Sequence, residues 1–129
     1  MNRPQMISSI SVLAVLASAS VSLPALAADD TVTIVARFYA TPGKEAEAEA
    51  RLLKSLDFVR KNEPNITYKF YHSKKDPTLF LSYEIYPSQA ELENHVKNVL
   101  PASRAALGAF PDGMFSRPME FDMWQEMSN

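Results

Sequence analysis

His95 is the residue of this sequence best placed for acid–base chemistry. It lies at helical spacing among Leu92, Val96 and Val99, so a helix that buries this stripe holds an imidazole among apolar side chains. An uncharged imidazole in such surroundings can accept a proton from a weakly acidic hydroxyl group, which is the role of a general base. The competing interpretation is a structural histidine that donates to a backbone carbonyl or a carboxylate. The spacing alone leaves both interpretations open.

Four further polar side chains lie on expected strands and are candidates for the same site. Tyr68, Glu84 and Tyr86 belong to two consecutive strands, and Arg37 belongs to the first one. Tyrosine hydroxyls can hydrogen-bond an oxygen atom of a ligand, and an arginine can stabilise negative charge that develops during a reaction. Glu84 has a simpler alternative, an ion pair across strands with Arg37 or Lys69.

The composition excludes several other kinds of site. The chain has 129 residues and no cysteine, which excludes disulfides, thiolate metal ligands and cysteine nucleophiles. Its three glycines form no phosphate-binding loop or dinucleotide fingerprint, and no G-x-S-x-G motif occurs. His72 and His95 lack the spacing of a zinc site. Met119, Met123 and Met127 are more simply explained by packing than as copper ligands.

Hydrophobic periodicity predicts the elements that position these residues. Alternation of apolar and polar side chains predicts strands at 31–39, 66–72, 79–86 and 118–126. A stripe of four aliphatic residues predicts a helix over 44–62, which Glu63-Pro64-Asn65 ends. A second helix begins at Ser88, whose spacing to Glu91 matches a capping box, and a short helical piece over 102–107 follows Pro101.

The order strand, helix, strand, strand, helix, strand predicts an α+β fold. This β-α-β-β-α-β pattern is the ferredoxin-like arrangement, an antiparallel sheet with both helices on one face. The other face needs a cover, because it is expected to carry apolar and aromatic residues that are unfavourable in water. These residues are Val35, Tyr71, Phe80, Tyr86 and Trp124. A ligand or a second copy of the chain is expected to pack there.

The first 27 residues differ from the rest of the chain. Residues 6–28 carry no charged side chain, Arg3 precedes them, and Ala25-Leu26-Ala27 has the small-x-small pattern of a signal peptidase site. We therefore predict a signal peptide at 1–27, a single domain at 28–129, and a periplasmic or secreted protein. The domain has a formal charge of 12 − 15 = −3. This charge argues against nucleic acid or an anionic membrane as a partner.

An ordered set of short motifs resembles the antibiotic biosynthesis monooxygenase (ABM) family. The resemblance covers nearly all of 28–129 and rests on the combination of motifs. They are Thr41-Pro42-Gly43-Lys44 after the first strand, Glu63-Pro64-Asn65 at the helix end, Asp76-Pro77 in the turn, Glu84-Ile85-Tyr86 at the end of the third strand, and His95 on the second helix. Asn65 stands where the family usually has glycine, and Tyr86 stands where it usually has tryptophan.

The resemblance implies a dimeric α+β barrel with a pocket between the sheet and the helices of each subunit. It implies an oxidoreductase, a monooxygenase that acts on a small phenolic or quinol substrate with O₂ and needs no cofactor. His95 would then be the base or orient the substrate, Tyr68 and Tyr86 would hydrogen-bond a quinone oxygen, and Arg37 would stabilise negative charge. Glu84 matches the family's glutamate. The alternative is a non-catalytic dimeric protein that binds an aromatic metabolite or haem, or the haem-degrading branch of the family, which the tyrosine at position 86 disfavours.

Overall fold

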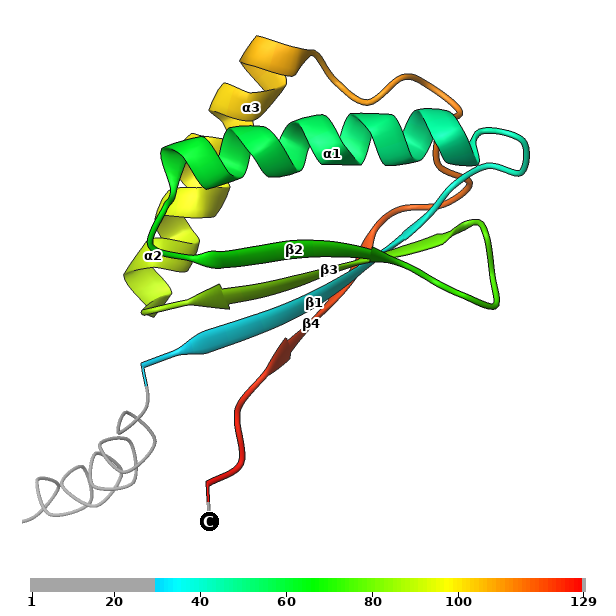
Figure 1. Cartoon of the computed structure of the whole chain (residues 1–129). Helices are drawn as coiled ribbons and strands as arrows, with labels where there is room; N and C mark the ends of the chain where they lie inside the picture. The colour runs from blue at the N-terminus through cyan, green and yellow to red at the C-terminus, as the bar shows by residue number, and fades with distance from the viewer. Residues whose placement is uncertain (1–29, 129) are drawn as a thin grey trace, which may run out of the picture.

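The computed structural model describes residues 30–128, which form one sheet with helices packed on one side of it (Figure 1). The predicted signal peptide at 1–27, and residues 28, 29 and 129 of the predicted domain, lie outside the described residues. None of the helices within 30–128 is long and apolar enough to cross a membrane. In chain order the elements are β1 (Val32–Tyr39), α1 (Glu45–Asn62), β2 (Thr67–His72), β3 (Leu79–Tyr86), α2 (Gln89–Asn94), the π-helix η2 (His95–Val99), α3 (Leu100–Leu107) and β4 (Glu120–Trp124).

The four strands form a single antiparallel sheet in the order β2-β3-β1-β4. Glu84 of β3 lies opposite Ile34 of β1 and opposite Tyr68 of β2, so these three side chains share one row on one face. Figure 1 shows α1, α2 and α3 on the same side of the sheet. This arrangement confirms the predicted ferredoxin-like α+β fold.

The first helix, α1, packs its apolar side against the sheet. Ala48, Leu52 and Val59 of α1 are buried, while the exposed positions carry mostly glutamate, lysine and other polar residues that favour a helix. The helix ends where predicted, because Pro64 disfavours a helical conformation at Glu63. The backbone N–H of Glu63 still donates to the Val59 carbonyl at 2.7 Å. This ending leaves the Glu63 side chain buried beneath the second helical stretch.

The second helical stretch runs without interruption from Gln89 to Leu107, which differs from the predicted break at Pro101. It begins as predicted at Ser88, whose hydroxyl oxygen accepts from the Glu91 backbone N–H at 3.3 Å. The helix then widens into the π-turn of η2, closed by a bond from the Leu100 N–H to the His95 carbonyl. Pro101 falls in the first turn of α3, where a residue without an N–H is tolerated. The proline therefore does not end the helix.

The two faces of the sheet have different surroundings. The helix face carries Phe80 and Tyr86, both buried, because they lie opposite Phe38 and Val32 on the helix side of β1. Their predicted position on the uncovered face is therefore wrong. The open face carries the other alternating set, which includes Val35, Tyr71, Leu81, Tyr83, Ile85 and Trp124. Tyr71 and Trp124 are 50% and 54% exposed on this face, so a large aromatic surface remains uncovered within the single chain.

Candidate active site

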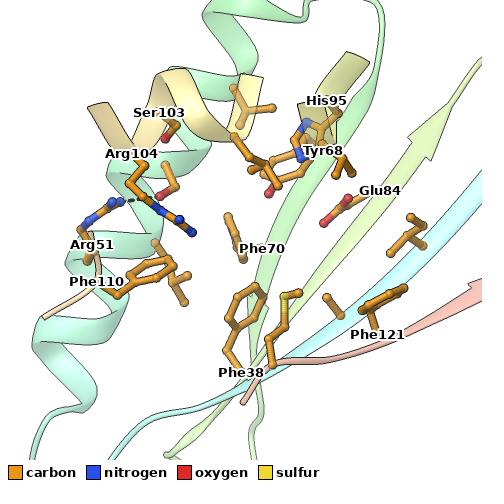
Figure 2. A pocket seen from close by; sticks show the side chains of 18 of the residues that line it. Phe38, Arg51, Tyr68, Phe70, Glu84, His95, Ser103, Arg104, Phe110 and Phe121 are labelled. Carbon is orange, nitrogen blue, oxygen red and sulfur yellow. Dashed lines mark hydrogen bonds between the residues drawn. The ribbon is translucent and has the colours of Figure 1, made fainter. Parts of the chain in front are cut away.

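A cavity of about 530 Å³ lies between the helix face of the sheet and the helices above it (Figure 2). Its volume is within the range of small-molecule sites in proteins. Most of its wall is apolar, and the polar side chains that line it belong to β2, β3, η2, α1, α3 and the segment before β4. They are Arg51, Ser55, Tyr68, Glu84, His95, Ser103, Arg104 and Arg117. The cavity thus combines an apolar body with a small set of polar groups.

His95 lies at one end of this cavity in a buried pair with Glu63. The distance from Nδ1 of His95 to Oε2 of Glu63 is 2.5 Å, and the two side chains are 3% and 2% exposed. With Glu63 ionised, Nδ1 carries the proton and Nε2 is left as the acceptor nitrogen. The second oxygen of Glu63, Oε1, is buried and has no hydrogen-bond partner within residues 30–128. Among the described residues, the Glu63 carboxylate therefore forms its side-chain hydrogen bond with His95 alone.

Two tyrosine rings pack against the imidazole. The ring centroid of Tyr68 lies 5.5 Å from that of His95, and the Tyr86 centroid lies 5.3 Å from it. The π-turn begins at His95 itself, so the residue sits at the point where the helix departs from regular geometry. Such π-turns inside α-helices occur frequently at functional sites. Packing and helix geometry together hold the ring in one orientation.

Glu84 lies beside this group in a second buried network. Its Oε1 accepts from the Ser82 hydroxyl at 2.8 Å, and its Oε2 accepts from the Tyr86 hydroxyl at 2.6 Å. Both donors come from β3, two residues away on either side, which is the spacing of neighbours on one face of a strand. The predicted alternative of an ion pair with Arg37 or Lys69 is therefore wrong. Glu84 is oriented by neutral hydroxyl groups and still lines the cavity.

Both tyrosines of the site are held in their neutral form. Burial raises the pKa of Tyr68 well above its usual value of 10, and the nearby carboxylates of Glu84 and Glu63 raise it further. Burial also raises the pKa of Tyr86, and its contact with Glu84 adds to the effect. Each hydroxyl is therefore a hydrogen-bond donor over the whole physiological pH range. Tyr86 donates to Glu84, whereas the Tyr68 hydroxyl has no bond to another residue of 30–128 and is available to a ligand.

The structure brings three of the five predicted site residues together at the cavity wall. Tyr68, Glu84 and His95 line the cavity, and Figure 2 shows them grouped at one end of it. Tyr86 is fully buried behind Glu84 and does not line it. The predicted place of Arg37 in the pocket is wrong: it lies on the open face, where its Nη1 is 2.9 Å from Oδ2 of Asp122. Strand alternation separates it from Ile34, Ala36 and Phe38, which do line the cavity.

The sequence interpretation missed two parts of the site. Glu63 was interpreted only as a helix end, although a carboxylate before a helix-ending proline is a group that the fold holds in one place. The arginines at the other end of the cavity, Arg51 and Arg104, stand at ordinary surface-like positions of their helices and gave no local signal. Within residues 30–128, no group of three or more histidine, aspartate or glutamate side chains is arranged to hold a metal ion.

Comparisons with known proteins agree with this fold and cavity. Residues 31–108 match the family model described as Antibiotic biosynthesis monooxygenase. Solved structures match over most of the described chain. A Caulobacter crescentus protein that carries the same family name has a TM-score of 0.65 and 23% identity, with 83% of this chain and 99% of that one covered. Rv0793 from Mycobacterium tuberculosis has a TM-score of 0.60 and 20% identity, with 77% and 97% covered.

A third structure, PA3566 from Pseudomonas aeruginosa, also has a TM-score of 0.60 and 20% identity, with 77% of this chain and 96% of that one covered. At these identities the solved structures support the fold alone. No curated protein matches the chain. The family model spans more than half of the sequence and includes β1, β2, β3, all the helices that the structure describes, and every cavity residue discussed above except Arg117. The chain therefore belongs to the antibiotic biosynthesis monooxygenase family.

Proposed function

We propose that the protein is a cofactor-independent monooxygenase that oxidises a small phenol or quinol with O₂. The observation that carries the proposal is the buried His95–Glu63 pair, which presents an oriented imidazole to an apolar cavity beside the Tyr68 hydroxyl. A histidine that is oriented by a carboxylate is a common arrangement for a catalytic base. Here the arrangement supports a base, and it does not by itself identify the reaction. Family membership supports the reaction class.

In the proposed reaction, Nε2 of His95 accepts the proton of the substrate hydroxyl, and Glu63 stabilises the positive charge that the ring acquires. The resulting phenolate gives one electron to O₂, and the two radicals combine at a ring carbon to form a peroxide. Loss of water then yields the quinone. One oxygen atom enters the product and the other leaves as water, so the substrate supplies all four electrons and no external reductant is needed.

The remaining side chains orient the substrate and its oxygen atoms. The neutral Tyr68 hydroxyl donates a hydrogen bond to the oxygen that carries negative charge after deprotonation. Glu84, held by Ser82 and Tyr86, accepts a hydrogen bond from a second hydroxyl of a quinol substrate. Because Glu84 is an acceptor with both of its oxygens oriented, it favours a substrate with two hydroxyl groups over a simple phenol. Tyr86 acts through Glu84 and is a positioning residue.

The test follows O₂ consumption with purified protein and a series of hydroquinones and phenols. His95→Ala is expected to lower the rate by a factor of about 10² to 10⁴, the usual contribution of a general base. His72→Ala is the matched control, because His72 is exposed and lies outside the cavity. Circular dichroism of both variants checks that they fold. If His95→Ala oxidises every substrate as fast as His72→Ala, the proposed role of His95 is wrong.

The proposal extends to a homodimer that covers the open face of each sheet. Val35, Tyr71, Tyr83 and Trp124 form an apolar and aromatic surface there, and exposed surfaces of this kind often mark contacts between proteins. A second copy would bury this surface without closing the cavity, which lies on the helix face. Native mass spectrometry is expected to give twice the mass of the chain. Tyr71→Lys combined with Trp124→Lys is expected to give the monomer, because it places two charges at the interface.

A further inference from the structure

Two arginines at the far end of the cavity have no carboxylate partner among the described residues. Arg51 of α1 and Arg104 of α3 both line the cavity, and neither belongs to an ion pair within residues 30–128. A shortage of acidic residues does not explain this, since the chain has 15 acidic and 13 basic ones. Arg117, the third arginine at the cavity, lies 3.8 Å from Glu120 and stacks over Tyr39. The positive charge of the other two is left uncompensated.

The Arg51 guanidinium is nevertheless held in a defined position. Nη1 donates to the Ser55 hydroxyl at 2.5 Å, Nη2 donates to the Gly108 carbonyl at 2.7 Å, and the group stacks 4.7 Å from the centroid of Phe110. Its Nε is buried without a hydrogen-bond partner in the described chain. Neutral acceptors and an aromatic ring fix the direction of the group without cancelling its charge. Such an arginine is preorganised for an anion.

The two polar ends of the cavity lie far apart. Figure 2 shows Arg51 and Arg104 at one end and Tyr68, His95 and Glu84 at the other, with Phe70 between the two groups. Arg51 lies in α1, twelve positions before Glu63, the residue that directly follows this helix; twelve residues correspond to about 18 Å at 1.5 Å per residue. The length of the arginine side chain shortens the gap inside the cavity. An elongated molecule is needed to contact both ends.

We propose that Arg51 and Arg104 form a subsite for the carboxylate of an aromatic hydroxy acid whose hydroxyl group lies at His95. The proposal rests on the proposed function, which places the reacting hydroxyl at the His95 end. Planar guanidinium groups match a carboxylate through paired hydrogen bonds, and the apolar middle of the cavity suits fused aromatic rings. Phe38, Leu52 and Phe70 line this middle section. The subsite would select substrates with the acid and the hydroxyl at opposite ends.

The test measures binding in the absence of O₂, so that affinity is separated from oxidation. The probes are 6-hydroxy-2-naphthoic acid and its methyl ester, which share the ring system and the hydroxyl and differ in charge. The wild type is expected to bind the acid at least about tenfold more tightly than the ester, the usual effect of a charge-assisted hydrogen bond. Arg51→Gln and Arg104→Gln are each expected to reduce this preference, and the double variant is expected to bind both probes within about twofold of each other.

Lys54→Gln is the matched control. Lys54 lies on α1 three residues after Arg51, is exposed, and does not line the cavity, so its loss removes the same charge without touching the subsite. Arg104→Gln keeps the test valid if Arg51→Gln fails to fold, because Arg104 is exposed. Equal affinity of the wild type for the two probes, no binding of the acid, or an undiminished preference in folded Arg104→Gln and double-variant proteins would overturn the subsite.

Oxidation assays separate this proposal from the proposed function. If the acid is preferred and the arginine variants lose that preference, but no hydroxyl compound consumes O₂, then the subsite stands and the monooxygenase function is wrong. If O₂ is consumed with the same KM for the acid and the ester, then the subsite is wrong and the monooxygenase function stands. If both proposals hold, Arg104→Gln raises KM for the acid and leaves kcat close to that of the wild type, whereas His95→Ala lowers kcat.

Discussion

The helix face carries two histidine–glutamate pairs in contrasting surroundings. At the end of β2, Nδ1 of His72 lies 3.9 Å from Oε1 of Glu49, and the two side chains are 66% and 49% exposed. At the other end, His95 and Glu63 approach to 2.5 Å and are almost completely buried. Glu49 lies within α1 and Glu63 directly follows it, so one helix positions both carboxylates.

The difference shows that burial, more than residue type, decides what a histidine–glutamate pair does. Around His72 and Glu49, water solvates both groups whether or not they touch, so the contact contributes little to stability. Around His95 and Glu63, water is excluded, so each group depends on the other for its hydrogen bond. Only the second pair holds an imidazole in a single orientation, which is what acid–base chemistry requires.

Removing each carboxylate in turn is the strongest test of this contrast. Glu63→Ala is expected to lower the free energy of unfolding by about 2–3 kcal/mol, since it leaves the buried Nδ1–H group of His95 without an acceptor. Glu49→Ala is expected to lower it by less than about 1 kcal/mol. Urea denaturation followed by circular dichroism measures both. Glu63→Gln, which keeps an oxygen acceptor for Nδ1, is expected to fall between them. Equal effects of the two alanine substitutions would contradict the contrast.

The buried hydrogen bond from the Tyr86 hydroxyl to Glu84 can be compared with the hydroxyl of Tyr71 on the open face of the sheet. Tyr86→Phe removes the donor to Glu84 and is expected to lower the free energy of unfolding by about 1–3 kcal/mol, the cost of leaving a buried acceptor unpaired. Tyr71→Phe removes the hydroxyl of a residue that is half-exposed in the single chain and has no side-chain hydrogen bond within residues 30–128, and it keeps the ring that packs in the proposed dimer. It is therefore expected to change the free energy of unfolding by less than about 0.5 kcal/mol. The same denaturation experiment compares them. A loss in Tyr71→Phe as large as that in Tyr86→Phe would show that hydroxyl burial is not the cause.

The fold was predictable because its signals are local. Alternation of apolar and polar residues depends only on strand geometry, and the predicted third strand coincides with β3, Leu79–Tyr86. The break predicted at Pro101 failed because a π-turn and the first turn of a new helix together accommodate a proline within a continuous stretch. That adjustment depends on the packing of the whole helix on the sheet, which periodicity does not describe.

The candidate site was predictable only in part. His95 was found because apolar spacing placed it on the buried stripe of a helix. Glu84 was found through its match to the family's glutamate, and Tyr68 through its hydroxyl group on an expected strand. Strand alternation places Arg37 and Ile34 on opposite faces of β1. Arg37 was wrongly predicted in the pocket because it was chosen for its charge, without regard to the face of the strand on which it lies. Glu63 was missed because its partner His95 lies 32 positions further along the chain. Arg51 was missed because only the folded structure shows that it lines the cavity and forms no ion pair within residues 30–128.

Raising the pH above 10 is expected to destabilise the folded protein through the two buried tyrosines. The folded state raises the pKa of Tyr68 and Tyr86 above the value of 10 that each has when unfolded. Both tyrosines therefore contribute stability that is fully present below pH 10 and is lost as the pH rises further, because only the unfolded chain then releases their protons. The loss is about 1.4 kcal/mol per pH unit for each buried tyrosine.

Urea denaturation between pH 9 and 11 measures this dependence. Tyr68→Phe is expected to have a shallower decline than the wild type, because one of the two linked protons is removed. A decline that is identical in Tyr68→Phe and in the wild type would show that Tyr68 ionises as easily in the folded protein as in the unfolded one.

The smallest expected difference between the two histidine–glutamate pairs is in how the salt concentration changes their contribution to stability. This dependence shows whether water surrounds each pair. Any stabilisation by Glu49 beside His72 acts through water, so the effect of Glu49→Gln should shrink from at most a few tenths of a kcal/mol towards zero between about 0.05 and 0.5 M NaCl. The effect of Glu63→Gln should not change over the same range, because ions do not enter the buried pair. Thermal unfolding of both variants and the wild type at each salt concentration measures this. Equal salt sensitivity would mean that water reaches His95 and Glu63, and the imidazole would then lack the dry environment that its proposed role as a base requires.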